Sequence, residues 1–314
     1  MGCTAERSKG GGTRTARDGG HERSRVPQPP EPAQGAQSVE NLKDKAMNAV
    51  LTPTTDHTPA SAHKRPHVTV RGLHKSFAGA PLYTDFNLDL PRGKIVSIFG
   101  PNGCGKSTLM NMIAGLIPLD QGEILFDGKT LKDTKIGYVF QNYRDALFPW
   151  ITARDNIAYP LRRQGMKEAE VQTRVDELIQ LFEIRFDLSR YPYELSGGQQ
   201  QTVCIMRSLA PRPEIMFLDE PFSALDFEMT LFIREKLQEA HVATGTTMVI
   251  VSHDLEDAVF LADEILLLTR RPTRIAEIVP FNLPRPRIPE TMADPEFVRV
   301  KSRTLEVFRR EMKA

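Results

Sequence analysis

The sequence has few cysteines and lacks long apolar runs. Three cysteines in 314 residues, at positions 3, 104 and 204, are too few and too scattered for a disulfide framework or a metal site. We therefore expect a reducing compartment. The run without charged side chains at 107–119 has thirteen residues, short of the roughly 18 that span a bilayer. No apolar segment follows Met1, so we expect no secretory signal.

The chain also lacks a bias toward charge of one sign. It has 41 Lys and Arg against 40 Asp and Glu, which gives a formal net charge of +1. Proteins that bind nucleic acid usually carry a strongly basic surface, so this balance predicts no nucleic-acid partner. The length of 314 residues allows one large domain with extensions, or two small domains.

Residues 1–65 differ in composition from the rest of the chain. They contain consecutive glycines at 10–12, paired prolines at 29–30 and many Ser, Thr and Arg, with almost no aliphatic periodicity. Such a segment buries too little apolar surface to offset its ordering entropy, so we predict a disordered tail. The start of the chain invites a myristoylation interpretation, but Glu6 stands where that pattern requires Ser or Thr, which favours a plain tail.

From residue 66 onward, strand and helix patterns alternate. Alternating or short apolar runs predict strands at 67–70, 86–90, 94–99, 215–218, 248–251 and 265–268. Apolar residues at helical spacing predict helices at 167–182, 227–240 and 255–262. Strands that alternate with helices predict an α/β fold with a mostly parallel sheet. No internal repeat is found.

The strongest local signal is a phosphate-binding pattern, G-x-x-x-x-G-K-[ST], between a predicted strand and a helix. It is matched in full by Gly100, Pro101, Asn102, Gly103, Cys104, Gly105, Lys106 and Ser107. Glycines let backbone N–H groups converge on phosphate oxygens, and the helix N-terminus adds positive potential. Lys106 would contact the β- and γ-phosphates and Ser107 would bind Mg²⁺, with Thr108 beside them. The alternative is a chance glycine-rich turn, and Cys104 is expected to be a small residue rather than a reactive thiol.

A second pattern follows the predicted strand 215–218. Its apolar residues deliver two adjacent carboxylates, Asp219 and Glu220, to the end of the strand at which ligands bind in open α/β sheets. Asp219 suits the Mg²⁺ shell, and Glu220 is placed to act as the base toward an attacking water. Many strands end in acids, so this pattern is weak alone. Beside the phosphate loop it predicts a P-loop ATPase.

Further motifs resemble those of the ABC ATPase family, over roughly residues 67–290. The matches are Leu195-Ser196-Gly197-Gly198-Gln199 for the signature, Gln141 for the Q-loop, Ser223-Ala224-Leu225-Asp226 for the D-loop and His253 for the switch histidine. Phe77, 29 residues before Lys106, stands where the family places an aromatic residue that stacks on adenine. The alternatives are an ordinary strand-end aromatic for Phe77, a structural histidine for His253 and a polar loop residue for Gln141.

The resemblance implies a P-loop NTPase (RecA-like) core with an antiparallel β subdomain, and an inserted α-helical signature subdomain at about 142–205. The ATPase domain would span 66–290, and 291–314 would form a C-terminal helical extension. ATP and Mg²⁺ would be bound, with Lys106, Glu220 and His253 as catalytic residues. The resemblance also implies Gln141 as a Mg²⁺ ligand, in addition to Ser107 and Asp219.

The resemblance further implies a head-to-tail dimer of two copies. The residues that would contact the ATP of the opposite copy are Ser196, Gly197, Gly198 and Gln199. One departure stands out, because Thr202 follows the signature glutamines where the family usually carries arginine. A hydroxyl in place of a five-donor cation puts local helix contacts and the strength of dimer closure in question.

Two stretches resemble the branch of importers for nitrate, sulfonate, taurine or bicarbonate. They are 142–152, with its LFPW segment, and 270–287, with RRPTRI and NLPRPR. This branch implies integral membrane permease subunits as partners, at the cytoplasmic face of the membrane, with a periplasmic or extracellular solute-binding protein involved indirectly. Phe148 and Trp150 would anchor the permease, or else pack into the subdomain core. Arg285 and Arg287 are expected on a solvated face.

Two other functions are weighed against the importer. An exporter ATPase is disfavoured by the LFPW and LPRPR stretches. A non-transport ABC ATPase of the DNA-repair type would need long coiled coils, whereas only 90 residues separate Lys106 from Ser196. A translation type would carry two cassettes, and this chain has one.

Overall fold

The structure, a computed structural model, describes residues 67–223 and 225–313. The tail predicted for residues 1–65 therefore lies outside the described residues. Over those ranges, no helix combines the length and the apolar character that crossing a membrane requires.

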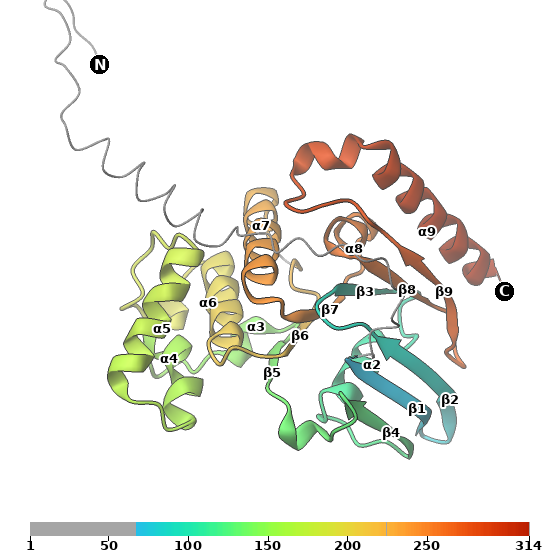
Figure 1. The fold of residues 1–314 in the computed structure, drawn as a ribbon, viewed down its shortest axis with the longest axis horizontal. Helices are drawn as coiled ribbons and strands as arrows, with labels where there is room; N and C mark the ends of the chain where they lie inside the picture. The colour runs from blue at the N-terminus through green and yellow to red at the C-terminus, as the bar shows by residue number, and fades with distance from the viewer. Residues whose placement is uncertain (1–66, 224, 314) are drawn as a thin grey trace, which may run out of the picture. The chain divides into compact units, whose positions relative to one another are not determined.

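A six-stranded sheet runs through the centre of the described chain, in the order β5-β6-β7-β3-β8-β9 (Figure 1). Its strands are β3 (Ile95–Phe99), β5 (Ile136–Val139), β6 (Ile215–Asp219), β7 (Thr247–Val251), β8 (Glu264–Leu268) and β9 (Ile275–Pro280). All neighbours pair in parallel except β8 and β9. Strands β3, β6 and β7 are buried at every position, as expected where both faces of a parallel sheet are covered. The predicted parallel α/β sheet is confirmed.

A separate antiparallel sheet has the order β2-β1-β4. Its strands are β1 (Val68–Phe77), β2 (Ala80–Leu90) and β4 (Gln121–Phe126). The strands predicted at 67–70 and 86–90 are the paired ends of β1 and β2. The sequence analysis did not predict β4, β5 or β9. In β4 the first three residues are exposed, so the strand has no alternation of apolar and polar positions to recognise.

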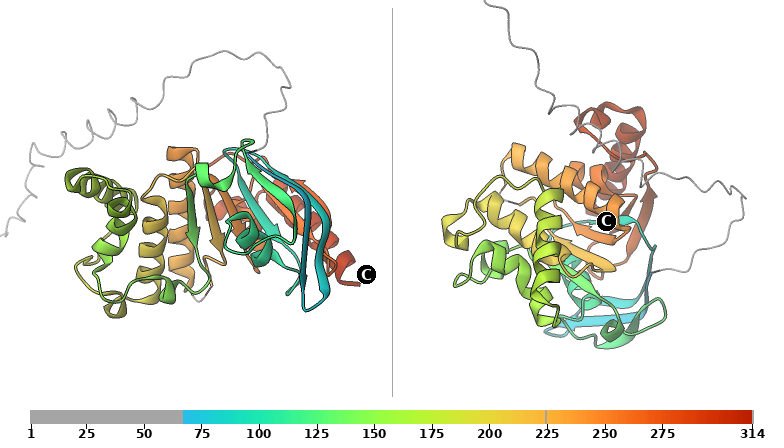
Figure 2. Two further views of the ribbon diagram at one scale, coloured as in Figure 1. Left: turned by 90° about the horizontal axis from the view of Figure 1, so that it is seen from below. Right: turned by 60° about the vertical axis from the view of Figure 1, so that its left-hand side comes forward.

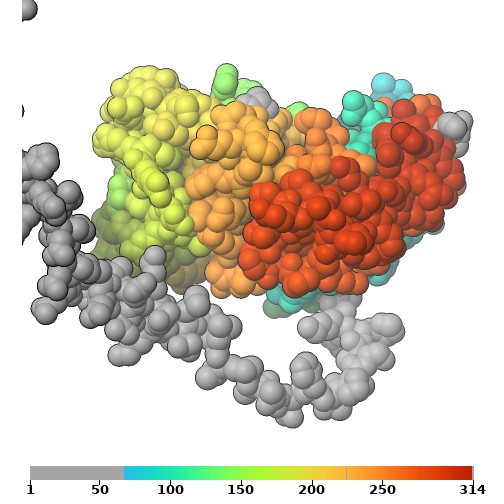
Figure 3. Space-filling view, turned by 90° about the horizontal axis from the view of Figure 1, so that it is seen from above, coloured from blue at the N-terminus to red at the C-terminus, as the bar shows by residue number. Residues whose placement is uncertain are grey.

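The helices divide into groups around the six-stranded sheet. They are α2 (Lys106–Ile113), α3 (Tyr143–Ala146), α4 (Ala153–Arg163), α5 (Glu168–Leu181), α6 (Gly197–Leu209), α7 (Phe227–Thr244), α8 (Leu255–Leu261) and α9 (Pro295–Lys313). Helices α3 to α6 pack on one another beside the β5 edge of the sheet, and the three-stranded sheet lies on the other side (Figure 2). Helix α9 packs on α8 and β9, and with the segment before it covers much of one face (Figure 3).

The two faces of the six-stranded sheet contribute to two apolar cores. In β6, Met216 and Leu218 belong to the core formed with helices α3 to α9. Ile215 and Phe217 belong to the core formed with α2 and the three-stranded sheet. This alternation follows from the two-residue period of a strand. Strand β6 is therefore held from both faces, and the residue at its end has a fixed position.

The expectation of a solvated face for Arg285 and Arg287 is wrong. Arg287 is 3% exposed, and only 9% of the Arg285 side chain is exposed. Arg287 Nη1 donates to the carbonyls of Phe260 at 2.9 Å and Ala262 at 2.6 Å, and Arg285 Nη2 donates to the carbonyl of Leu261 at 2.7 Å. These carbonyls end α8, where no further helical N–H follows, so both arginines cap a buried helix C-terminus.

Replacing Arg287 by methionine should destabilise the protein by about 3 kcal/mol, because buried carbonyls lose their donors. Urea unfolding followed by circular dichroism measures the change in the free energy of unfolding. The control is Arg299→Met, because the Arg299 side chain is 63% exposed and pairs with Glu296 on the surface. That variant should unfold at nearly the parent urea concentration. Equal effects of the two substitutions would contradict the capping role.

Candidate functional site

The loop Gly100–Ser107 connects β3 to α2, as the phosphate-binding pattern predicts. Gly105 precedes α2 in the left-handed region, with φ 105°, and a Cβ there would lie 2.9 Å from Tyr83 Oη. At Gly100 a Cβ would lie 2.9 Å from the carbonyl oxygen of Leu268. Both positions therefore require glycine. At these two positions the backbone passes too close to its neighbours for a side chain, as expected of a backbone cradle for phosphate.

Three consecutive carbonyls of the loop accept hydrogen bonds from side chains outside it. The contacts are Arg271 Nε to Gly103 O at 2.7 Å, Thr273 Oγ1 to Cys104 O at 2.5 Å and Tyr83 Oη to Gly105 O at 3.0 Å. Because these carbonyls are bound on the outside, the loop is fixed from β2 and from the turn between β8 and β9. None of the three donors was predicted to support the loop. Tyr83 belongs to no motif, and Arg271 and Thr273 belong to the 270–275 stretch that resembles the importer branch. Each donor lies at least 22 positions from its acceptor.

Lys106 and Cys104 have different roles in this loop. Lys106 is 8% exposed, and its Nζ donates to the carbonyls of Gly100 at 2.9 Å and Pro101 at 3.2 Å. Its ammonium therefore lies over the start of the loop, where it can exchange carbonyl oxygens for phosphate oxygens. Cys104 is buried, and burial raises the pKa of its thiol, so it remains a neutral packing residue at neutral pH.

Ser107 and Asp219 form an oxygen pair suited to Mg²⁺. Asp219 ends β6, and its Oδ1 accepts a hydrogen bond of 2.9 Å from Ser107 Oγ. Burial raises the pKa of Asp219, the Ser107 hydrogen bond opposes this shift, and repulsion from Glu220 adds to it. A bound divalent cation would relieve both the burial cost and the repulsion. A hydroxyl and a carboxylate oxygen are ligands that Mg²⁺ takes, so the residues present fit the ion.

Glu220 is the point at which three motifs meet. Gln141 Nε2 donates to Glu220 Oε2 at 2.8 Å, and His253 Nδ1 lies 3.4 Å from the same oxygen. These residues come from the ends of the neighbouring strands β5, β6 and β7. Glu220 has φ 49°, a left-handed backbone that costs a non-glycine residue on the order of 1–3 kcal/mol. Its N–H donates to Val251 O at 2.9 Å, which helps to hold this conformation.

A cavity of about 780 Å³ opens beside the phosphate loop. It is lined by residues 100–104, by His253 and by Phe308 and Met312 of α9. The ring of Phe308 lies 5.2 Å from that of Phe99, the residue before the loop. The sequence analysis predicted only a helical extension at 291–314 and did not anticipate that α9 would reach the loop. A cavity of this size is within the range of small-molecule sites.

The signature residues lie at the start of α6, apart from the phosphate loop. Ser196 Oγ accepts from the N–H of Gln199 at 3.3 Å, and Gln199 Oε1 accepts from the N–H of Ser196 at 2.9 Å. A Cβ at Gly197 would lie 2.8 Å from Tyr143 Oη, and one at Gly198 would lie 2.7 Å from Met229. Within 67–223 and 225–313, no hydrogen bond or ion pair joins this turn to residues 100–107. One copy of the chain therefore does not bring the two motifs together.

Two further residues singled out in the sequence are Thr202 and Phe77. Thr202 is 1% exposed and its hydroxyl donates to Gly198 O at 2.9 Å, so the helix contact that replaces the family arginine is satisfied within α6. Phe77 ends β1 with 45% of its surface exposed, and Lys75 Nζ lies 5.4 Å from the centre of its ring. Phe77 does not line the cavity beside the loop. Its stacking on adenine stays a prediction.

Comparison with known proteins agrees with this geometry. The family model described as ABC transporter matches residues 83–223. The aliphatic sulfonates import ATP-binding protein SsuB of Bacillus licheniformis is 38% identical over 247 residues, which cover 77% of this chain and 94% of that protein. The sulfate/thiosulfate import ATP-binding protein CysA of Neisseria meningitidis is 39% identical over 210 residues, or 64% of this chain. The chain spans 58% of the length of that relative.

Solved structures also match this chain. The ATP-binding cassette MJ0796, a dimer in a post-hydrolysis state bound to ADP and Pi, matches with a TM-score of 0.61 and 30% identity. The match covers 69% of this chain and 99% of the cassette. The protein cbiO1 from Clostridium perfringens, part of the ABC transporter complex cbiONQ, matches with a TM-score of 0.63, 26% identity and coverage of 80% and 100%. The chain therefore belongs to the ABC transporter family and carries its ATPase domain.

Proposed function

We propose that this chain is the ATP-binding and ATP-hydrolysing subunit of an importer, which powers the uptake of a small solute through a membrane permease. The observation that carries the proposal is the meeting of Gln141 and His253 at the carboxylate of Glu220, next to the Ser107–Asp219 pair. Mg²⁺, when bound at that pair, supplies positive charge to the phosphate oxygens. Phosphoryl transfer depends mainly on positioning and charge stabilisation, which these residues are arranged to provide.

Each residue has a defined part in this proposal. Lys106 and the N–H groups at the start of α2 bind the β- and γ-phosphates. Glu220 accepts the proton of the attacking water, and Gln141 and His253 orient its carboxylate and the γ-phosphate. The side-chain oxygen of Gln141 would serve as an additional Mg²⁺ ligand. Phe77, exposed at the end of β1, stacks on adenine.

A second copy of the chain completes the site in this proposal. Ser196 and the glycines after it begin α6, so their N–H groups and the helix dipole are available to an anion. Among the described residues, no hydrogen bond or ion pair joins them to the phosphate loop of the same chain, which leaves them for the loop of a partner. The related cassette MJ0796 has been solved as a dimer. A head-to-tail pair that closes on ATP and opens after hydrolysis follows from this arrangement.

An aromatic cluster on the helical subdomain supports a permease partner. Trp150 is 71% exposed, which excludes its packing into the subdomain core. The ring of Phe148 lies 5.5 Å from that of Trp150 and 4.7 Å from that of Tyr159. Buried Asn156 fixes the loop, because it bonds both the N–H and the carbonyl of Phe148. A rigid, exposed aromatic anchor is the kind of surface that dominates binding energy at protein interfaces.

The functions for which the relatives are named bear on the solute. SsuB is named for the import of aliphatic sulfonates, and CysA for that of sulfate and thiosulfate. These names support an importer of a small anion or related solute, such as nitrate, sulfonate, taurine or bicarbonate. An external solute-binding protein would select the solute, and this chain would work at the cytoplasmic face of the membrane as a peripheral subunit. An exporter ATPase or a non-transport ABC ATPase remains the alternative function.

The Glu220→Gln variant should bind ATP but lose about 10²–10⁴-fold in turnover, because an amide cannot accept the proton of water. Phosphate release measures turnover, and calorimetry measures ATP binding. Size-exclusion chromatography with ATP should show a trapped dimer. Glu123→Gln, on exposed β4, is the control and should retain the parent rate. Hydrolysis by Glu220→Gln at the parent rate would mean that Glu220 is not the base.

The Thr273→Val and Tyr83→Phe variants should each raise the KM for ATP about fivefold, with kcat less affected. Each removes one hydroxyl that holds a carbonyl of the phosphate loop, an interaction worth about 1 kcal/mol. Steady-state ATPase kinetics give both constants. Tyr159→Phe removes a hydroxyl far from the loop in sequence and should leave KM unchanged. If the first two variants also keep the parent KM, the carbonyl contacts do not tune phosphate binding.

The Trp150→Ala variant should weaken association with the permease by about 30-fold, the effect of losing an interface anchor worth about 2 kcal/mol. The ATPase activity of the soluble protein should not change. Tagged parent and variant, purified from native membranes with ATP, are compared by quantitative mass spectrometry, with Ile288→Ala as an exposed apolar control. Full permease recovery with the variant would exclude the anchor. Recovery by the parent of only soluble, ribosomal or DNA-bound partners would contradict the importer.

A further inference from the structure

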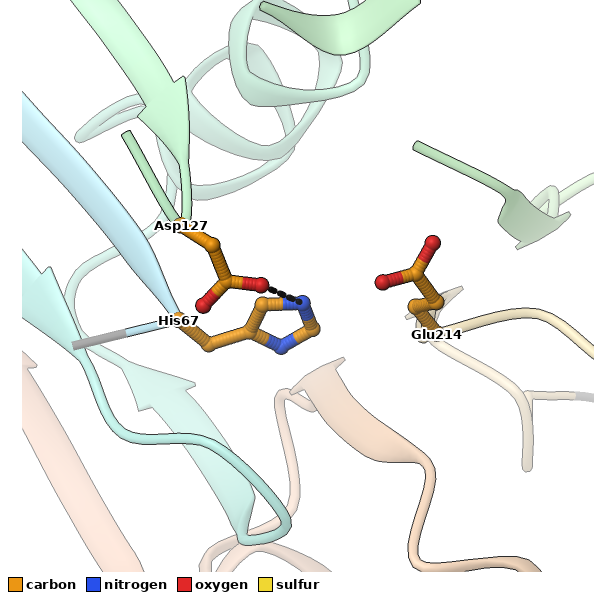
Figure 4. Close-up of side chains that lie close together, drawn as sticks. All are labelled: His67, Asp127 and Glu214. Atoms are coloured by element: carbon orange, nitrogen blue, oxygen red, sulfur yellow. Dashed lines mark ion pairs between the residues drawn. The ribbon is translucent and has the colours of Figure 1, made fainter. Parts of the chain in front are cut away.

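Three side chains with metal-ligand atoms meet at the end of β6 that is remote from Glu220. His67 directly precedes β1, Asp127 directly follows β4 and Glu214 directly precedes β6 (Figure 4). One ligand atom from each lies within 4.8 Å of the others. The cluster joins the three-stranded sheet to the six-stranded sheet. None of these residues takes part in the nucleotide site described above.

The imidazole of His67 has a nitrogen that no protein group satisfies. His67 is 0% exposed, and its Nδ1 lies 2.7 Å from Thr247 Oγ1. Its Nε2 is buried without a hydrogen-bond partner and points between the two carboxylates, 4.0 Å from Asp127 Oδ2 (Figure 4). Buried polar atoms are rarely left without a hydrogen-bond partner, so Nε2 is a candidate to bind a ligand.

The hydrogen bond at Nδ1 of His67 determines which ring nitrogen is free for a ligand. A proton on Nδ1 that donates to Thr247 leaves the lone pair on Nε2, the arrangement in which metal-binding histidines are usually held.

The backbone of the cluster is held in place by hydrogen bonds. The N–H of Asp127 donates to His67 O at 2.9 Å, and the N–H of Thr247 donates to Glu214 O at 3.1 Å. Thr247 is buried, and its Oγ1 also accepts from the N–H of Gly93 at 2.9 Å. Thr247 thus positions two of the three residues, which is the outer-shell support that metal sites require.

Arg92 is the cation that now partners the carboxylates. Its Nη2 is hydrogen-bonded to Asp127 Oδ2 and lies 3.9 Å from Glu214 Oε2. The Arg92 side chain is 48% exposed, so it can turn to solvent. Two carboxylates face one guanidinium, which balances only one of their two negative charges. The guanidinium does not reach the orphaned Nε2 of His67, so it satisfies only part of the cluster.

We propose that His67, Asp127 and Glu214 bind a divalent transition-metal ion of the Zn²⁺ class, which displaces Arg92. Nε2 of His67 and one oxygen of each carboxylate would be the ligands, with water in the fourth position. The Asp127 and Glu214 side chains are 37% and 42% exposed, so they can close to the ligand distances of about 2.0–2.2 Å. An imidazole with carboxylates selects Zn²⁺ over Mg²⁺ or Ca²⁺, which prefer oxygen ligands alone.

The bound ion would act as a structural link between the two sheets. It would attach residues next to β1 and β4 to a residue next to β6 at the end remote from Glu220. A ligand that binds only the folded state stabilises it in proportion to the logarithm of its concentration. The expected consequence is an increase in thermal stability with Zn²⁺, without any requirement for the ion in ATP hydrolysis.

The test is a titration of the full, nucleotide-free chain with ZnCl₂, followed by calorimetry and by thermal unfolding. The parent should bind one ion at this cluster and unfold at a higher temperature. Asp127→Asn and Glu214→Gln should each weaken this binding at least tenfold and remove the thermal shift. Arg92→Gln should tighten binding several-fold, because the competing cation is gone. Glu123→Gln, an exposed acid on β4 outside the cluster, is the matched control.

The outcomes separate this site from others. Zn²⁺ bound near Asp219, Glu220 and His253 would be unaffected by Asp127→Asn, so equal affinity in the parent, Asp127→Asn and Glu214→Gln overturns the proposal. An unchanged or weaker Zn²⁺ affinity in Arg92→Gln would also overturn the proposal. The cluster would then be an ion pair between Arg92 and the two carboxylates. Mg²⁺-dependent ATP turnover should be the same in the parent and in Asp127→Asn. Failure of the metal site is thus distinguishable from failure of the proposed ATPase.

Discussion

The burial of β6 on both faces is the constraint on which the rest of the structure depends. Its side chains alternate between two cores, so the strand cannot shift or turn without exposing one of them. Asp219 and Glu220 are consequently delivered to one fixed edge of the sheet. Strands β5 and β7, paired on either side, bring Gln141 and His253 to the same edge. The geometry of the proposed catalytic residues is thus a consequence of strand pairing.

The phosphate loop shows a similar dependence on its surroundings. Glycines make the loop conformation accessible, but they also leave the unfolded chain more freedom to lose. In the folded chain, three donors outside the loop restrict its conformation. Tyr83, Arg271 and Thr273 each donate a hydrogen bond to one loop carbonyl. The contacts extend the functional site into β2 and into the turn between β8 and β9, which lie outside the motifs that predict the nucleotide site.

The sequence predicted the parts of this protein whose signals are local. The loop at 100–107, the acidic pair after β6 and the helix at α5 are recognisable because neighbouring residues determine them. It did not predict β4, whose exposed residues have no apolar alternation, or the burial of Arg285 and Arg287. A string of arginines and prolines is usually solvated. Here the last carbonyls of α8 have no helical N–H to accept from. Only the folded chain places these arginines close enough to donate to them.

What the sequence by itself determined is therefore the family, the type of sheet and the residues that are proposed to bind phosphate and Mg²⁺. Short-range chemistry specifies these, since a glycine-rich turn, a helix N-terminus and a strand-end carboxylate need no distant partner to be identified. The tertiary structure alone decided which residues surround Glu220, that Trp150 is exposed and that His67 lies with Asp127 and Glu214. Contacts of this kind join residues at least 33 positions apart, as for His253 and Glu220. Their formation depends on the packing of both faces of the sheet, which no local pattern records.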